Sequence, residues 1–257
     1  MQTQPVENVE RVPETSSTDF LFPLKSRATV ARETMAFEFD TSAAKDFNFQ
    51  AGQSVDLTLI NPPETDPEGD TRTFSLASSP LHRDSFIVAT RMRSTAFKRS
   101  LQTIPLGTKV RVSQPAGSFA LPEETSKPVV FVAGGIGITP FRSMIEWVVE
   151  EKIPYQMTLF YSNRSPADVA FLKDFEQWRG HASNFKFIPT ITQLGDASWP
   201  YERGRVDAAM IKKHIPPLAQ QIYFVAGPTT MVFATKETLI KAGVNEANIR
   251  SDEFYGY

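Results

Sequence analysis

Apolar and polar residues alternate in short runs through the first half of the chain, as in half-buried β-strands. The alternation predicts strands over Arg27–Phe39, Ser54–Ile60, Phe74–Ala77, Ser85–Arg91 and Lys109–Ser113. Helical spacing is confined to Thr95–Leu101 and a short piece near Ala43–Asp46. The segment Asn61–Asp70, rich in proline and acidic residues, is expected to be an exposed loop. Many short strands with little helix predict a closed antiparallel β-barrel.

The pattern changes at Lys127, where strands begin to alternate with helices. Strands are expected over Val129–Ala133, Tyr155–Tyr161, Phe185–Thr190, Gln221–Ala226 and Asn248–Phe254. The helices between them are expected over Thr139–Val148, Pro166–Trp178, Val206–Lys213 and Thr229–Ala242. This rhythm predicts a parallel sheet covered by helices on both faces. The chain thus divides into a polar N-terminal tail (1–19), a barrel domain (20–122) and an α/β domain (127–257).

A glycine turn joins the first strand of the α/β half to its first helix. Gly134, Gly135 and Gly137 follow an apolar, β-branched run, and Thr139 and Pro140 stand where a helix N-cap and first helical residue are expected. Glycines let an anion approach the backbone, and the first N–H groups of the helix point at it. A tight turn with no ligand is the alternative interpretation.

Two more strand ends carry polar or glycine-rich segments, namely Tyr161-Ser-Asn-Arg164 and Ala226-Gly-Pro-Thr-Thr-Met231. Ligands of parallel sheets bind at the carboxyl ends of strands. Two glycine turns that lead into helices at one sheet edge are hard to explain by packing alone. The three segments together favour a dinucleotide site.

The predicted barrel has a candidate site of its own at Arg72-Thr-Phe-Ser75. A guanidinium suits a pyrophosphate, and an aromatic ring suits stacking on a planar heterocycle. A cationic cluster follows in sequence, formed by Arg91, Arg93, Lys98 and Arg99. One phosphorylated ligand would explain this cluster, and so would a solvated basic face.

Composition excludes several other classes of function. The net charge of −2 argues against a general nucleic-acid binder. The absence of cysteine excludes disulfides and an iron–sulfur cluster held by this chain, and the three histidines show no metal-ligand spacing, so no metal is expected. No apolar run is long enough to span a membrane, and the N-terminus has no apolar signal core, so a cytoplasmic location is expected.

At this point the chain resembles the ferredoxin–NADP reductase superfamily, whose members join an antiparallel six-stranded flavin barrel to a parallel α/β nucleotide domain. The resemblance spans roughly residues 20–257. It rests on five segments in the family's order: Arg72-Thr-Phe-Ser75, Pro115-Ala-Gly-Ser-Phe-Ala-Leu121, Gly134-Gly-Ile-Gly-Ile-Thr-Pro140, Gly227-Pro-Thr-Thr-Met231 and Glu253-Phe-Tyr-Gly256. Each segment alone is weak, whereas the ordered set is specific.

The resemblance implies FAD and NADH or NADPH as cofactors. Arg72 would bind the flavin pyrophosphate, Phe74 would lie against the flavin, and Ser75 would hydrogen-bond it near the atom that receives hydride. Tyr255 would cover the ring face that nicotinamide must reach, with Glu253 nearby as a proton or hydrogen-bond partner. Ser75, Glu253 and Tyr255 are therefore the implied catalytic residues.

The implied cofactor-binding residues come from both halves of the chain. On the flavin side they are Arg72, Thr73, Phe74, Ser75, Thr90, Arg91, Met92, Thr95, Ala96, Phe97, Lys98 and Tyr255. On the pyridine-nucleotide side they are Gly135, Gly137, Thr139, Pro140, Ser162, Arg164, Gly227, Pro228 and Met231.

The chain departs from the family pattern in three places. The family's Gly-x-x-Ser appears as Thr95-Ala-Phe-Lys98, so the Lys98 ammonium would replace the hydroxyl. Ala226 stands in place of the family's cysteine. Ser162 and Arg164 suit a 2′-phosphate, but Thr192-Gln193 stands where NADP-specific members often have Ser-Arg, which favours NADH.

The implied activity is an NAD(P)H reductase that passes electrons through FAD to a separate acceptor, either a ferredoxin, an oxygenase component or a haem protein. A small acceptor such as a ferric chelate, free flavin or quinone is one alternative. A non-catalytic electron-transfer or regulatory subunit with a degenerate site is another. No nucleic acid or membrane partner is expected.

Overall fold

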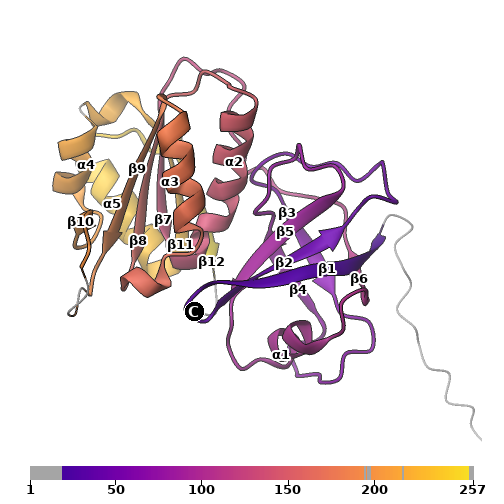
Figure 1. Cartoon of the computed structure of the whole chain (residues 1–257). Helices are drawn as coiled ribbons and strands as arrows, with labels where there is room; N and C mark the ends of the chain where they lie inside the picture. Colours follow the sequence, from indigo (N-terminus) through magenta and orange to yellow (C-terminus); the bar gives the residue numbers. More distant parts are fainter. Residues whose placement is uncertain (1–18, 194, 196–197, 216, 255–257) are drawn as a thin grey trace, which may run out of the picture.

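The computed structural model of the chain describes residues 19–193, 195, 198–215 and 217–254. The predicted tail (1–19), apart from Asp19, and Tyr255 lie outside the described residues. Two six-stranded sheets lie side by side, one from each half of the chain (Figure 1). The fold class is as predicted, with an antiparallel N-terminal sheet and a parallel C-terminal sheet covered by helices.

The N-terminal sheet is antiparallel, with strand order β4-β3-β6-β1-β2-β5. Its elements are β1 (Phe20–Ala31), β2 (Thr34–Asp40), β3 (Ser54–Thr58), β4 (Thr71–Ser75), β5 (Ser85–Arg91), helix α1 (Ala96–Thr103) and β6 (Lys109–Val112). A bridge between Leu76 and Val88 joins the two outer strands and closes the sheet into a barrel. Alternate side chains fill its interior, among them the fully buried Phe37, Phe39 and Phe86.

The run Arg27–Phe39, predicted as one strand, is two strands joined by a tight turn at Arg32 and Glu33. Glu33 adopts a positive φ of 52°. In β1 the buried side chains, such as Leu24, are at even-numbered positions, whereas in β2 Phe37 and Phe39 are at odd-numbered positions. This change in the phase of the alternation is the sequence signal of the turn. Neither turn residue is a glycine, proline or asparagine, so turn chemistry gave no second signal.

The short helix predicted near Ala43–Asp46 is absent, and the segment forms isolated turns instead. The amide of Ala44 donates to the carbonyl of Thr41, and the amide of Phe47 to that of Ala44. Phe47 is buried among the barrel aromatics, where its ring lies 5.0 Å from that of Phe22. Burial of the Phe47 ring therefore fixes the path of this segment. The segment does not form a helix because it has no apolar helical face to bury.

The C-terminal sheet is parallel, with strand order β10-β9-β8-β7-β11-β12. Its strands are β7 (Val129–Gly134), β8 (Met157–Asn163), β9 (Phe185–Ile191), β10 (Glu202–Arg203), β11 (Ile222–Pro228) and β12 (Ile249–Phe254). The helices are α2 (Thr139–Glu150), α3 (Leu172–His181), α4 (Ala208–His214) and α5 (Thr229–Lys241). Helices α2 and α3 pack on one face and α4 and α5 on the other (Figure 1). The two-residue strand β10 was not predicted.

The expected helix Pro166–Trp178 is broken into a 3₁₀ turn (Pro166–Asp168) and helix α3. Phe171, between the two, has a left-handed φ of 58°. Within the described residues, no helix has both the length and the apolar character needed to cross a bilayer.

A buried polar cluster joins the two sheets where α2 meets the loop that follows β4. The Arg142 guanidinium on α2 donates to the carbonyl of Ala77 at 2.6 Å and to Glu146, one turn later, at 3.1 Å. The Glu146 carboxylate also accepts the amide N–H of Ser79 at 2.6 Å. The side chains of Arg142 and Glu146 are only 9% and 7% exposed. We call this cluster the inter-sheet clamp.

The Arg142 guanidinium also contacts residues of α3 and the turn before it. It pairs with Asp174 on α3 at 2.8 Å and lies 4.9 Å from the ring centre of Phe171 and 5.4 Å from that of Trp178. Burial raises the pKa of the Glu146 carboxyl, and the Arg142 charge opposes that rise. Without Arg142, Glu146 would therefore be a buried acid that has lost its counter-charge.

We expect Arg142→Met to lower the free energy of unfolding by about 3–5 kcal/mol, because it leaves the Glu146 carboxylate buried without its counter-charge. Urea denaturation followed by circular dichroism measures this. Arg179→Met, which removes a surface arginine of α3, is the matched control with an expected loss under about 1 kcal/mol. Equal stability of the two variants would contradict the structural role of the clamp.

Candidate functional site: two adjoining cavities

The barrel carries a groove of about 520 Å³ between strand β4, helix α1 and the end of β12. We call it the barrel groove. Arg72 and Phe74 enter it from β4, and Thr95 and Lys98 enter it from the start of α1. Phe74 packs against Phe97 of α1 at 5.9 Å between ring centres, so the strand and the helix are held together at the base of the groove. The groove therefore combines an aromatic wall with the cationic side chains of Arg72 and Lys98, and Arg93 adds a third cation.

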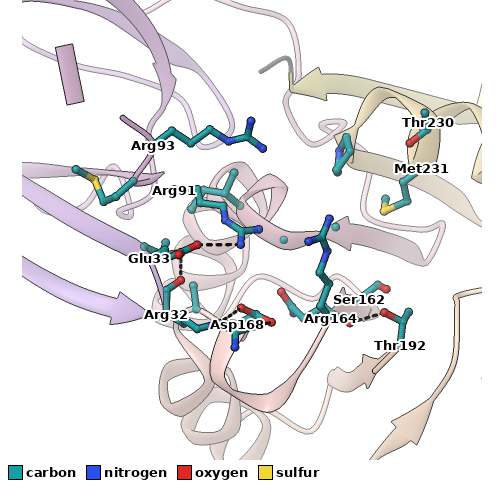
Figure 2. Close-up of a pocket in the computed structure, with 18 residues that line it drawn as sticks. Arg32, Glu33, Arg91, Arg93, Ser162, Arg164, Asp168, Thr192, Thr230 and Met231 are labelled. Atoms are coloured by element: carbon teal, nitrogen blue, oxygen red, sulfur yellow. Dashed lines mark hydrogen bonds and ion pairs between the residues drawn. The ribbon is translucent and has the colours of Figure 1, made fainter. Parts of the chain in front are cut away.

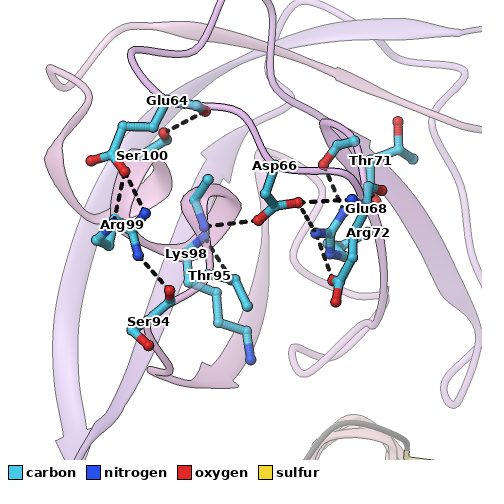
Figure 3. Close-up of polar contacts among 12 residues, drawn as sticks. Glu64, Asp66, Glu68, Thr71, Arg72, Ser94, Thr95, Lys98, Arg99 and Ser100 are labelled. Atoms are coloured by element: carbon cyan, nitrogen blue, oxygen red, sulfur yellow. Dashed lines mark hydrogen bonds and ion pairs between the residues drawn. The ribbon is translucent and has the colours of Figure 1, made fainter.

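The Arg72 guanidinium is held by the loop that precedes its own strand (Figure 3). Its Nη1 donates to the carbonyls of Glu68, Gly69 and Thr71, and its Nη2 pairs with the carboxylates of Asp66 and Glu68. The side chain remains 20% exposed toward the groove. A fixed cation at the wall of a groove is suited to a bound anion.

Lys98 is the second cation of the groove. Burial, together with the nearby charges of Arg93 and Arg72, lowers the pKa of its ammonium to about 8. Its Nζ donates to the carbonyl of Arg91 at 2.8 Å. An anion placed beside these cations would favour the protonated lysine, so the groove is electrostatically prepared for a phosphate group.

A second cavity, of about 560 Å³, lies at the carboxyl ends of β7, β8 and β11 (Figure 2). We call it the sheet-edge cavity. Gly135 lines it from the turn after β7, Ser162 from the end of β8, Arg164 from the residue after β8, and Met231 from the first turn of α5. The barrel supplies the opposite wall through Arg32, Glu33, Arg91, Met92 and Arg93. Arg93 lines both cavities, so the two adjoin.

The glycine turn after β7 shapes this cavity in two ways. Gly135 has a positive φ of 54°, and a Cβ built on it would meet no atom within 4 Å, so its backbone is open to a ligand. A Cβ on Gly137 would lie 2.5 Å from the carbonyl oxygen of Ala226. Gly137 therefore allows the close approach of the turn to β11 and does not itself line the cavity.

The helix after this turn begins earlier than the sequence predicts. A 3₁₀ turn over Gly135–Ile138 runs directly into α2. Thr139, predicted as the N-cap, is buried inside the helical segment, and its hydroxyl donates to the carbonyl of Ile136. The first N–H groups of this helical segment thus belong to the glycine turn, beside the cavity.

The sheet-edge cavity is positively charged overall. Arg32 pairs with Asp168 at 2.8 Å and Arg91 with Glu33 at 3.3 Å (Figure 2). Although burial alone would raise the pKa of Asp168, hydrogen bonds from Ser165 and Arg32 lower it. No carboxylate of the described residues lies within 4 Å of the Arg164 guanidinium. This cation at the end of β8 is available to a ligand phosphate.

The structure gathers most of the predicted site residues around these two cavities. Those lining the barrel groove are Arg72, Thr73, Phe74, Thr90, Thr95, Lys98 and Glu253. Those lining the sheet-edge cavity are Gly135, Ser162, Arg164, Pro228 and Met231, together with Arg91 and Met92, which were assigned to the flavin side. Six of the other predicted residues are buried and line neither cavity, namely Ser75, Ala96, Phe97, Gly137, Thr139 and Pro140. Gly227 is likewise buried, and Tyr255 lies outside the described residues.

Several lining residues were not chosen from the sequence. Arg32 and Glu33 were missed because their turn was read as the middle of a strand. Asp252 lines the barrel groove next to the predicted Glu253; burial raises the pKa of its carboxyl, and the Glu253 charge adds to the rise. Arg93 was recognised only as part of the basic cluster, and its place between the cavities depends on how the two sheets meet.

The donor set fits a flavin and a pyridine dinucleotide. The barrel groove offers an aromatic wall, three cations and a helix start to a planar ring with an anionic tail. The sheet-edge cavity offers the open backbone of Gly135 and the Arg164 guanidinium to a dinucleotide. Two such ligands would meet where Arg93 separates the cavities.

Comparisons with known proteins agree with this geometry. Residues 131–237 match the family described as "Oxidoreductase NAD-binding domain". The chain is 25% identical over 236 residues to reductase component 1 of terephthalate 1,2-dioxygenase from Comamonas sp., covering 91% of this chain and 68% of that protein. It is 30% identical over 212 residues to the phenol 2-monooxygenase reductase component DmpP from Pseudomonas sp. strain CF600, covering 80% and 58%.

Ferredoxin–NADP reductase B of Sorangium cellulosum is 28% identical over 218 residues, covering 82% of this chain and 85% of that protein. Among solved structures, the cytochrome P450 reductase GcoB from Amycolatopsis has the same fold, with a TM-score of 0.79 at 22% identity over 92% of this chain and 69% of that one. The sequence matches and the fold together show that the chain belongs to the ferredoxin–NADP reductase superfamily.

Proposed function

We propose that this protein is an FAD-dependent NAD(P)H reductase that delivers electrons to a separate acceptor. The observation that carries the proposal is the pair of adjoining cavities. One has the aromatic and cationic walls that a flavin needs, and the other has the glycine-edged strand ends that a pyridine nucleotide needs. Proximity of the two ligands is the main contribution such a protein makes to the reaction.

Bound FAD would supply the redox chemistry, accepting two electrons from the nucleotide and passing them on. The protein's own residues position the reactants. Arg72 and Lys98 would hold the flavin pyrophosphate, and Phe74 would lie against the flavin. Gly135 and Arg164 would hold the nucleotide phosphates at the sheet edge.

The assignments of Ser75, Glu253 and Tyr255 as catalytic residues stay predictions. Glu253 and its neighbour Asp252 both line the barrel groove, where Glu68 is also found. Ser75 is 8% exposed and would act only on a flavin atom brought close to the β4 backbone. The division into a flavin domain (20–122) and a nucleotide domain (127–257) follows the two sheets, and we propose it on that basis.

The acceptor we propose is a protein on a separate chain, an oxygenase component or a ferredoxin. The supporting observation is that the terephthalate and phenol relatives are named as reductase components of oxygenases. Small acceptors stay an alternative, as does a non-catalytic subunit, since Ala226 replaces the family cysteine and is fully buried. A cytoplasmic location stays a prediction.

Anaerobic mixing tests the function directly. We expect purified protein loaded with FAD to be yellow and to bleach rapidly with NADH, and more slowly with NADPH, because Thr192-Gln193 lacks the Ser-Arg pair. Stopped-flow absorbance gives both rates. A protein that takes up no FAD would support the non-catalytic alternative, and a large preference for NADPH would overturn the expected nucleotide choice.

A second test uses the lowered pKa of Lys98. Below about pH 8 this lysine is protonated and attracts the flavin pyrophosphate, and above that pH the attraction is lost. We therefore expect the FAD dissociation constant to rise several-fold between about pH 6.5 and about pH 9.5. Fluorescence titration measures this, and Lys98→Met is the control.

The variant should bind FAD more weakly than the wild type at neutral pH, and this part of the pH dependence should disappear. A Lys98→Met protein with the same pH profile as the wild type would contradict the assignment of Lys98 to the pyrophosphate.

A further inference from the structure

The segment predicted as an exposed loop (61–70) places three carboxylates on neighbouring arginines (Figure 3). Glu64 pairs with Arg99 at 2.5 Å on the outer side of α1. Asp66 and Glu68 both pair with Arg72, at 3.3 Å and 2.9 Å. Of the three, Glu68 alone lines the barrel groove.

Asp66 joins two elements that face the groove. Its Oδ1 accepts from the Arg72 guanidinium, and its Oδ2 accepts the amide N–H of Ala96, the first residue of α1, at 2.9 Å. Although desolvation opposes it, hydrogen bonds from the amides of Ala96 and Glu68 lower the pKa of Asp66, so it is a carboxylate at neutral pH. Its side chain is 21% exposed and stands outside the groove lining. Asp66 therefore supports Arg72 and the helix start from behind.

The Arg72 guanidinium has little freedom in this arrangement. Both Nη atoms are committed to residues 66–71, and one face lies 5.3 Å from the ring centre of Phe97. Among the described residues, its Nε–H has no hydrogen-bond partner. The guanidinium is thus held in one orientation with a donor left over, as a preorganised anion site requires.

Glu68 differs from Asp66 in position. Its side chain is 69% exposed, and its carboxylate lies on the groove side of the same guanidinium. A pyrophosphate in the groove would bring a second negative group to that cation. Like charges at close range oppose one another, so Glu68 competes with such a ligand for Arg72.

We propose that Asp66 is a positioning residue for the flavin pyrophosphate, and that Glu68, two residues later, is a competing anion that weakens flavin binding. The two carboxylates thus set flavin affinity in opposite directions through one arginine. This inference rests on the proposed binding of FAD in the barrel groove.

The test compares FAD with riboflavin, which has the same ring but no phosphate. Each flavin is titrated into flavin-free protein, and dissociation constants are taken from fluorescence. For Asp66→Asn we expect FAD to bind at least about tenfold more weakly, because the charge that orients Arg72 is gone. For Glu68→Gln we expect FAD to bind about two- to fivefold more tightly, as suits the loss of an exposed repulsive charge.

Riboflavin affinity should change less than about twofold in both variants, since riboflavin has no phosphate for Arg72 to bind. Glu64→Gln is the matched control, because it removes the same charge from the same loop without touching the groove. It should leave both affinities unchanged. Asp66→Glu keeps the charge and should recover part of the FAD affinity lost in Asp66→Asn.

Each outcome bears on the proposal. Tighter FAD binding by Asp66→Asn would show that Asp66 is also a competitor, and equal loss of FAD and riboflavin would show a general structural role; either overturns it. Weaker FAD binding by Glu68→Gln would overturn the proposal that Glu68 competes with the flavin. This comparison can be made even if Asp66→Asn does not fold. A wild-type protein that binds no FAD would refute the proposed function itself.

Discussion

The buried pair of Arg142 and Glu146 is the constraint on which the two-sheet arrangement depends. Arg142 belongs to the helix that starts at the nucleotide turn, and its partner Ala77 lies two residues beyond the flavin motif on β4. The clamp therefore ties together the chain segments that follow the two candidate binding motifs. Because both charged side chains are almost completely buried, a displacement that separates them would raise the free energy of the folded state. The clamp therefore helps to fix how the two cavities are placed relative to each other.

Charge is distributed to suit two phosphate-bearing ligands. Arg93 stands between the cavities, Lys98 titrates unusually low, and Arg164 faces the sheet edge. The acidic residues of the same surfaces are placed to orient the arginines, as Asp168 does for Arg32 and Asp66 for Arg72. The sheet-edge cavity therefore has more cations than carboxylates, although the net charge of the whole chain is only −2.

Much of this could be predicted from the sequence. Strict alternation predicted the barrel, the change of rhythm at Lys127 predicted the parallel sheet, and Arg72, Lys98 and Gly135 were found from motifs. The clamp could not be predicted, because an arginine inside an apolar helix face gives no sign of the carbonyl it will meet. Asp66 was missed for a similar reason: an acidic loop reads as solvated until its cation is placed beside it.

The claim that the clamp sets the distance between flavin and nucleotide is tested most directly by single-turnover kinetics of Arg142→Met at a temperature where the variant is folded. We predict that FAD affinity stays within about twofold of the wild type, while flavin reduction at saturating NADH slows by at least about tenfold, as expected when a positioned pair is displaced. A variant that retains FAD and is reduced at the wild-type rate would contradict the account.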